Sequence, residues 1–79
     1  MVNVKNKDTV IRETIRQNII AKRLELKLTQ TELAEKVNLK KNTIASWEQG
    51  LSSPDIDTIV MLLKLFNMDF YEFTGTKHD

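Results

Sequence analysis

Glycine and proline are scarce in this chain, and this scarcity is the feature that most limits the folds open to it. The 79 residues include two glycines and one proline. Folds built from many short strands need turn-forming residues at regular intervals, so the sequence favours helices over a β-sandwich. A chain of this length forms one small domain at most. The absence of cysteine excludes a disulfide framework or a thiolate metal site and fits a reducing compartment.

Apolar residues recur at helical spacing in several segments, and capping residues separate these segments. The pattern predicts helices over about 9–27, 30–37, 41–49 and 55–66, followed by a short fifth helix after Asp69. Thr29 with Glu32, and Asp69 with Glu72, have the spacing of capping boxes at helix N-termini. No segment alternates as a strand does. The expected fold class is therefore all-α, with five helices around one core.

The ends of the chain are expected to lie outside the domain at 9–74. Residues 1–8 are polar and have no helical period, which predicts a flexible N-terminal arm with Asp8 as a helix cap. Residues 75–79 are expected to form a tail that carries the one histidine, His78. The chain has neither a signal-peptide segment nor an apolar run near the roughly 18 residues of a membrane span, so we expect a cytoplasmic location without a membrane partner.

The charge is distributed unevenly although the net charge is only +1. Residues 1–50 carry ten Lys or Arg and six Asp or Glu, a net charge of +4, whereas residues 51–79 carry two and five, a net charge of −3. This asymmetry is compatible with chance in so short a chain. It is equally compatible with a basic binding half on an acidic supporting half.

The stretch 30–49 is predicted to form two short helices joined by a tight turn at Asn38, a residue type that tolerates the left-handed conformation. A turn of three to four residues between short helices is typical of the helix-turn-helix motif. The outer face of its second helix, on which Asn42 and Ser46 lie one turn apart, is free to enter a DNA major groove. Trp47 lies on the opposite face and is expected in the core rather than as a stacking aromatic.

Four segments in this order and spacing carry a resemblance to a known family: AKRLELKLTQTELAEKV, TIASWEQG, SSPDIDTIVMLLKLF and MDFYEF. From about Ile15 to Phe73, the chain resembles the Cro/phage-repressor (Xre-like) helix-turn-helix proteins. The resemblance implies a compact lambda-repressor-like domain that binds specific sequences of double-stranded DNA. It also implies a transcriptional regulator, with repression in a phage or mobile element as the expected setting.

The resemblance further implies a role for individual side chains. Those expected to contact base edges are Lys41, Asn42 and Ser46. Those expected to contact phosphates are Gln30, Lys40, Thr43 and Gln49. An ion pair between Arg23 and Glu48 is expected to orient the second helix of the motif. The chemistry agrees with these roles, because asparagine can form a bidentate pair with adenine and lysine can donate to guanine.

Two lysines depart from the family pattern. Lys40 stands where an N-cap serine or threonine is usual, and with Lys41 it places two cations at the positive end of a helix, each unfavourable by ~0.3–1 kcal/mol. We expect them to bind phosphate, and the alternative is a solvated surface pair. Lys27 replaces a glycine that commonly ends the first helix. It either adopts a left-handed conformation at a cost of ~1 kcal/mol or marks a different turn.

The fourth helix is more apolar than one buried face requires. The residues expected to face the core are Ile56, Ile59, Val60, Leu63 and Phe66. Met61 and Leu65 fall outside this stripe and, with Met68, are a candidate dimer seam for a homodimer on a palindromic operator. The alternative is that the terminal segments 1–12 or 74–79 cover these three side chains.

The residue types needed for catalysis are nearly absent from the sequence. There is no glycine-rich phosphate loop and no cluster with metal-ligand spacing, so we expect no enzymatic activity, cofactor, metal or small-molecule ligand. The remaining alternative to DNA binding is an antitoxin or protein-interaction adaptor with the same fold. The outer face of 40–49 holds no large apolar residue, which favours a DNA groove over a protein surface.

Overall fold

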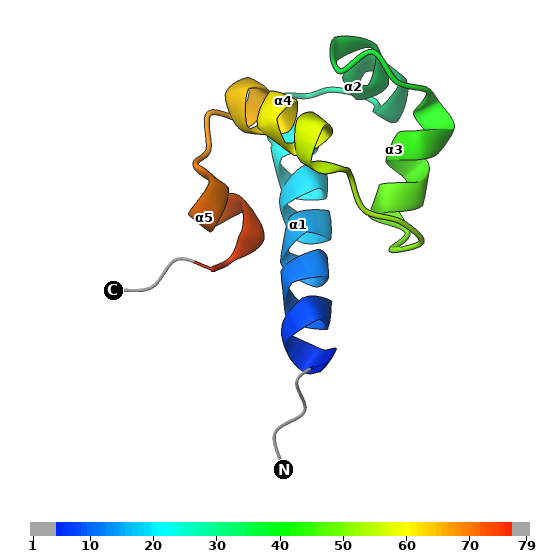
Figure 1. Ribbon diagram of the computed structural model, residues 1–79. Helices are drawn as coiled ribbons and strands as arrows, with labels where there is room; N and C mark the ends of the chain where they lie inside the picture. Colours follow the sequence, from blue (N-terminus) through cyan, green and yellow to red (C-terminus); the bar gives the residue numbers. More distant parts are fainter. Residues whose placement is uncertain (1–4, 77–79) are drawn as a thin grey trace.

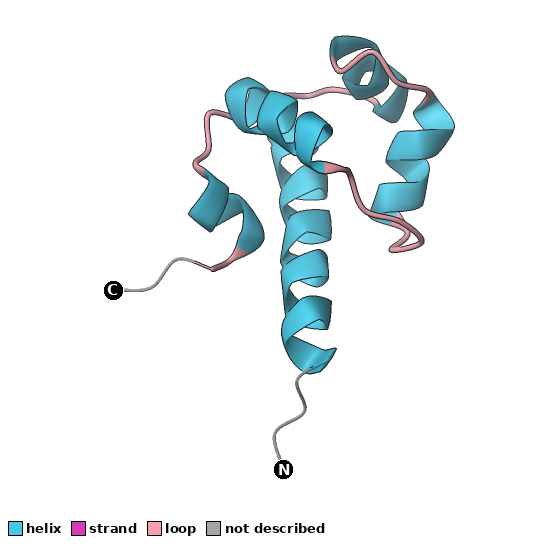
Figure 2. Ribbon diagram, viewed as in Figure 1, coloured by secondary structure: helices cyan, strands magenta, loops and turns pink. Residues whose placement is uncertain are grey.

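The computed structural model describes residues 5–76, which form five α-helices and no strand (Figure 2). The helices are α1 (Lys5–Glu25), α2 (Gln30–Lys36), α3 (Lys41–Glu48), α4 (Ile56–Phe66) and α5 (Phe70–Thr74). The all-α, five-helix prediction is confirmed. In Figure 1, α1 is the long central helix, with α5 packed on one side and α3 on the other. None of these helices is long and apolar enough to cross a membrane.

One core joins all five helices. Its buried apolar residues are Ile15, Ile19, Leu33, Ala34, Val37, Ile44, Trp47, Ile59, Leu62, Phe66 and Phe73. The most extensive contact between two helices is that of α2 with α3, where the small Ala34 is buried. Trp47 is a core residue, as expected. The two helices of the motif are therefore held against each other and against α1 by shared apolar burial.

All five helices end in the same way, on a residue in the left-handed conformation. These residues are Lys27, Asn38, Gly50, Asn67 and Gly75, with φ between 56° and 79°. In each case the next amide donates back to a carbonyl five residues earlier, as from Leu39 to Ala34 at 2.8 Å. Glycine usually occupies this position because it has no side chain to clash. Here Asn supplies two of the five ends and Lys one, which explains how so few glycines suffice.

The first helix differs from its prediction at both ends. It begins at Lys5 rather than near Thr9, so residues 5–8 are helical rather than part of an arm, and Asp8 lies within the helix. It ends at Glu25, followed by Lys27 with φ 60°. The left-handed alternative for Lys27 is therefore confirmed. Residues 1–4 and 77–79, including His78, lie outside the described residues.

The buried face of the fourth helix matches the expected one only in part. Ile59 and Phe66 are buried and Leu63 is half-buried, as expected for the core stripe. Ile56 and Val60, assigned to the same stripe, are 61% and 45% exposed, whereas Leu62, which was not assigned, is fully buried. The helix itself begins as expected, because the Asp55 carboxylate accepts the Thr58 amide at 2.9 Å. Pro54, which is compatible with the first turn of a helix, precedes this cap and lies outside the helix.

Candidate nucleic-acid interface

Helix α3 has one buried face and one polar, accessible face. Ile44 and Trp47 are 0% and 3% exposed and anchor the inner face. Residues four apart lie on one side of a helix, so two neighbouring rows form the outer face. These rows are Lys41, Ala45 and Gln49, and beside them Asn42 and Ser46. Three of these five side chains are exposed and two are half-buried, and none is a large apolar residue.

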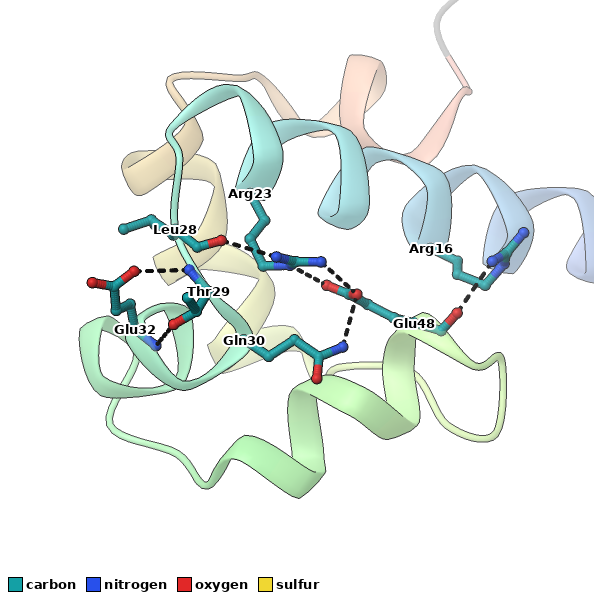
Figure 3. Close-up of polar contacts among 7 residues, drawn as sticks. All are labelled: Arg16, Arg23, Leu28, Thr29, Gln30, Glu32 and Glu48. Atoms are coloured by element: carbon teal, nitrogen blue, oxygen red, sulfur yellow. Dashed lines mark hydrogen bonds and ion pairs between the residues drawn. The ribbon is translucent and has the colours of Figure 1, made fainter.

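An ion pair fixes the orientation of α3 relative to α1 (Figure 3). Arg23 Nε donates to Glu48 Oε2 at 2.7 Å and Arg23 Nη2 donates to Glu48 Oε1 at 3.0 Å. The side chains are 13% and 9% exposed, so the pair is largely removed from water. A bidentate pair of this kind has a defined geometry as well as an energy. The expected contact between these two residues is present.

The start of α2 is joined to the same pair. Gln30 Nε2 donates to Glu48 Oε1 at 3.0 Å, and Arg23 Nη1 donates to the Leu28 carbonyl at 2.9 Å. Thr29 and Glu32 form the predicted capping box, in which each side chain accepts the other residue's amide. The C-terminus of α1, the N-terminus of α2 and the last turn of α3 therefore meet in one hydrogen-bonded cluster, shown in Figure 3.

The three residues expected at base edges all lie on the outer face of α3. Lys41 and Asn42 are exposed in its first turn. Ser46 is half-buried, and its hydroxyl lies 2.7 Å from that of Ser52 in the loop that follows α3. No pattern in the sequence indicated this contact, because it depends on how the loop turns back. Ala45 lies in the middle of the row that begins at Lys41, and its small side chain permits close approach of a partner.

The residues expected at phosphates are placed less uniformly. Lys40 and Gln49 are exposed at the two ends of α3, whereas Thr43 and Gln30 are half-buried. Lys40 is the N-cap residue of α3 but makes no side-chain capping hydrogen bond. No acidic residue lies in the first turn of this helix. The N-terminus of α3 therefore presents the positive end of the helix dipole together with two lysine side chains.

Arg16 is a residue whose role sequence reasoning missed. Its Nη1 donates to the Glu48 main-chain carbonyl at 3.1 Å, and its Nε donates to Glu13 at 2.9 Å. This arginine, followed by Gln17, lowers the pKa of the Glu13 carboxyl through hydrogen bonds. One available signal was spacing, because Arg16 and Arg23 are seven residues apart and share a face of α1. Both arginines bind the last turn of α3.

The candidate dimer seam is only partly accessible. Met61 is exposed on α4, but Leu65 and Met68 are half-buried and pack against the core. The side chains on α4 that are both apolar and exposed are Ile56, Val60 and Met61. In residues 5–76 no group of three or more His, Cys, Asp or Glu side chains is arranged to hold a metal ion.

The helix-turn-helix family model matches residues 19–73, which is more than half of the chain. The chain belongs to the helix-turn-helix family. This assignment confirms the resemblance to the Cro/phage-repressor proteins seen in the sequence. The match includes α2 to α4 and most of α5, and it excludes α1 before Ile19.

A curated relative is similar over part of its length. The chain is 40% identical over 40 residues to the HTH-type transcriptional regulator ImmR of Bacillus subtilis (strain 168). The aligned region is 51% of this chain and 32% of ImmR, so the chain spans about a third of that relative. No solved structure was found to match the chain.

Proposed function

We propose that this helix-turn-helix protein is a sequence-specific DNA-binding transcriptional regulator that inserts α3 into the major groove. The observation that carries the proposal is the polar outer face of α3, held at a defined angle by the Arg23–Glu48 ion pair and Gln30. An α-helix with its side chains is about 10–12 Å in diameter, which suits a major groove about 12 Å wide. The name of ImmR, a transcriptional regulator, supports the same function.

The proposed division of roles follows from chemistry and position. Lys40, with Gln30, Thr43 and Gln49, contacts phosphates, and phosphate contacts supply most of the affinity. Lys41, Asn42 and Ser46 contact base edges and supply most of the specificity. A backbone phosphate near the N-terminus of α3 converts the unfavourable pair Lys40 and Lys41 into an attraction. The action we propose is repression, in the cytoplasm and in a phage or mobile-element setting.

A salt series separates this function from that of a protein-interaction adaptor. The affinity of the chain for random duplex DNA is measured by fluorescence anisotropy between about 50 and 200 mM salt. Each phosphate contact contributes about 0.9 to the slope of log K against log salt, so two lysine contacts predict a slope of about −2 or steeper. A flat response, or no binding, contradicts DNA binding and favours an antitoxin or adaptor.

Asn42→Ala tests direct base reading. We expect this variant to lose preference at one base pair, at a cost of ~1–3 kcal/mol in binding the preferred site, because the bidentate contact is removed. Selection from random duplexes, carried out with the wild type and with the variant, measures the DNA sequence that each protein prefers. Lys40→Ala is the matched control, since loss of a phosphate contact weakens all sequences alike and leaves the motif unchanged. An unchanged motif for Asn42→Ala contradicts the assignment.

We further propose that the protein binds a palindromic operator as a homodimer, with half-sites about one helical turn, or ~34 Å, apart. The support is the exposed apolar side chains of α4, among which Met61 belongs to the candidate dimer seam with Leu65 and Met68. Sedimentation velocity at high micromolar concentration, with and without operator DNA, measures the assembly. A single 9.2 kDa species without DNA, together with one chain bound per operator duplex, contradicts the homodimer.

A further inference from the structure

A groove lined by both polar and apolar side chains runs between α1 and the loop that follows α3. Its volume is about 270 Å³. The polar residues on the α1 side are Arg12, Glu13 and Arg16, those on the loop side are Ser52 and Ser53, and Trp47 is among the apolar residues between them. The three α1 residues precede Ile19 and lie outside the segment that the family model matches, whereas the loop lies within it. The family match therefore covers the loop side of the groove but not Arg12.

Both walls of the groove are attached to α3. On the α1 side, Arg16 Nη1 donates to the main-chain carbonyl of Glu48 at 3.1 Å, as Figure 3 shows. On the loop side, the Ser52 hydroxyl lies 2.7 Å from that of Ser46 on the outer face of α3. The groove consequently has a defined position beside the helix that we propose enters DNA.

One cation that lines the groove has no partner among the described side chains, those of residues 10–76. Arg16 is neutralised by Glu13, to which it donates two hydrogen bonds. Arg12 is exposed, and it makes no hydrogen bond or ion pair with residues 10–76. Ser53 is also exposed, and it lines the loop side of the groove. A guanidinium and a hydroxyl that line the same small groove suit an anion with several acceptor oxygens.

We propose that this groove binds one backbone phosphate of DNA, with Arg12 providing the charge and Ser53 a hydrogen bond. The proposal rests on the proposed function, since a helix in the major groove is flanked by the phosphates of both strands. The loop with Ser52 and Ser53 continues directly from α3 and contacts its outer face, so it lies near one of these strands. Arg12 thus extends the DNA surface beyond the helix-turn-helix motif to α1.

Arg12→Gln is the first test, with Lys64→Gln as the matched control. Lys64 is exposed on the last turn of α4, which leads into α5 on the side of α1 away from α3 (Figure 1). Arg12→Gln removes one phosphate contact, so the slope of log K against log salt is expected to become about 0.9 less steep. Between 1 M and 0.1 M salt, the affinity of this variant should therefore rise about eightfold less than that of the wild type. Lys64→Gln is expected to keep the wild-type slope. The base preference is expected to stay unchanged. Both variants keep a good helix former, and far-UV circular dichroism checks that they fold.

Neutral methylphosphonate substitution locates the phosphate. At one position of the bound duplex, the substitution is expected to weaken the wild type and Lys64→Gln but not Arg12→Gln. Ser53→Asp, which places a carboxylate in the groove, is expected to weaken binding more than Ser53→Ala. If Arg12→Gln has the same salt slope as Lys64→Gln, or no methylphosphonate position distinguishes it from the wild type, the groove does not bind phosphate. If the wild type does not bind DNA at all, the proposed function fails as well.

Discussion

At the scale of single residues, Glu48 joins three helices. Its carboxylate accepts two hydrogen bonds from Arg23 of α1 and one from Gln30 of α2, and its main-chain carbonyl accepts one from Arg16. A carboxylate with so little exposure needs these donors, since an unpaired buried charge is strongly unfavourable. The C-terminal end of α3 is therefore tied to α1 and α2 through this one residue.

Glu48→Ala is expected to destabilise the domain by on the order of 3 kcal/mol, because it leaves the Arg23 guanidinium largely buried without its partner. Equilibrium unfolding in urea measures the loss. The double variant Arg23→Met with Glu48→Met is expected to lose less than the two single changes added together, because no unpaired charge remains. Strict additivity of the two changes would show that the pair contributes nothing as a pair.

At the scale of elements, α2 and α3 are stabilised by different means. Helix α2 begins with a complete capping box and has Glu32 in its first turn. Helix α3 has no side-chain cap and begins with two lysines. Helices this short are marginal by themselves in water. The burial of Ile44 and Trp47 and the cluster at Glu48 thus stabilise α3, while its N-terminus is left positively charged for a ligand.

Lys40→Ser is expected to stabilise the protein and weaken DNA binding. A serine cap contributes about 1 kcal/mol, which corresponds to a rise in Tm of about 4–8 °C for a domain of this size. Thermal unfolding and anisotropy with duplex DNA measure the two effects. Lys36→Ser, in the last turn of α2, removes the same charge where no cap is formed, so we expect no gain in stability. Unchanged DNA affinity in Lys40→Ser would contradict its phosphate contact.

At the scale of the whole molecule, α5 and the glycine that follows it pack against the middle of α1. The Asn18 side-chain amide donates to the Phe73 carbonyl at 3.0 Å, and Phe73 is fully buried. Gly75, with φ 74°, packs so closely on α1 that a Cβ atom there would lie 2.9 Å from Thr14 Cγ2. The chain after α4 thus returns to α1 and packs on the side of this helix that is turned away from α3.

Gly75→Ala is expected to be more destabilising than Gly50→Ala. Both changes force alanine into the left-handed conformation, at about 1 kcal/mol. Only Gly75→Ala adds a clash, for which overpacking predicts about 1–3 kcal/mol more, since the nearest atom at Gly50 is the Arg16 Cδ at 3.7 Å. Urea unfolding measures both. Adding Thr14→Ala to Gly75→Ala should recover most of the difference, and equal losses for the two glycine variants would show that α5 does not pack this tightly.

Local patterns in the sequence were sufficient to predict five helices, the two capping boxes and the helix-turn-helix motif, but not the start of α1. Capping boxes, left-handed ends and apolar spacing involve residues a few positions apart, so their physics is contained in short segments. The Arg23–Glu48 pair was reached through the family resemblance, and the structure brings the two side chains together.

Only the tertiary structure decided which face of α4 is buried and what surrounds α3. Helix α4 has apolar residues on more than one side, so periodicity could not distinguish Leu62 from Val60; packing against the other helices did. The contacts Arg16–Glu48 and Ser46–Ser52, and the groove at Arg12, depend on how α1 and a loop meet α3 in space. Short-range patterns determine where helices form, whereas the surface that α3 and its neighbours share exists only after they pack together.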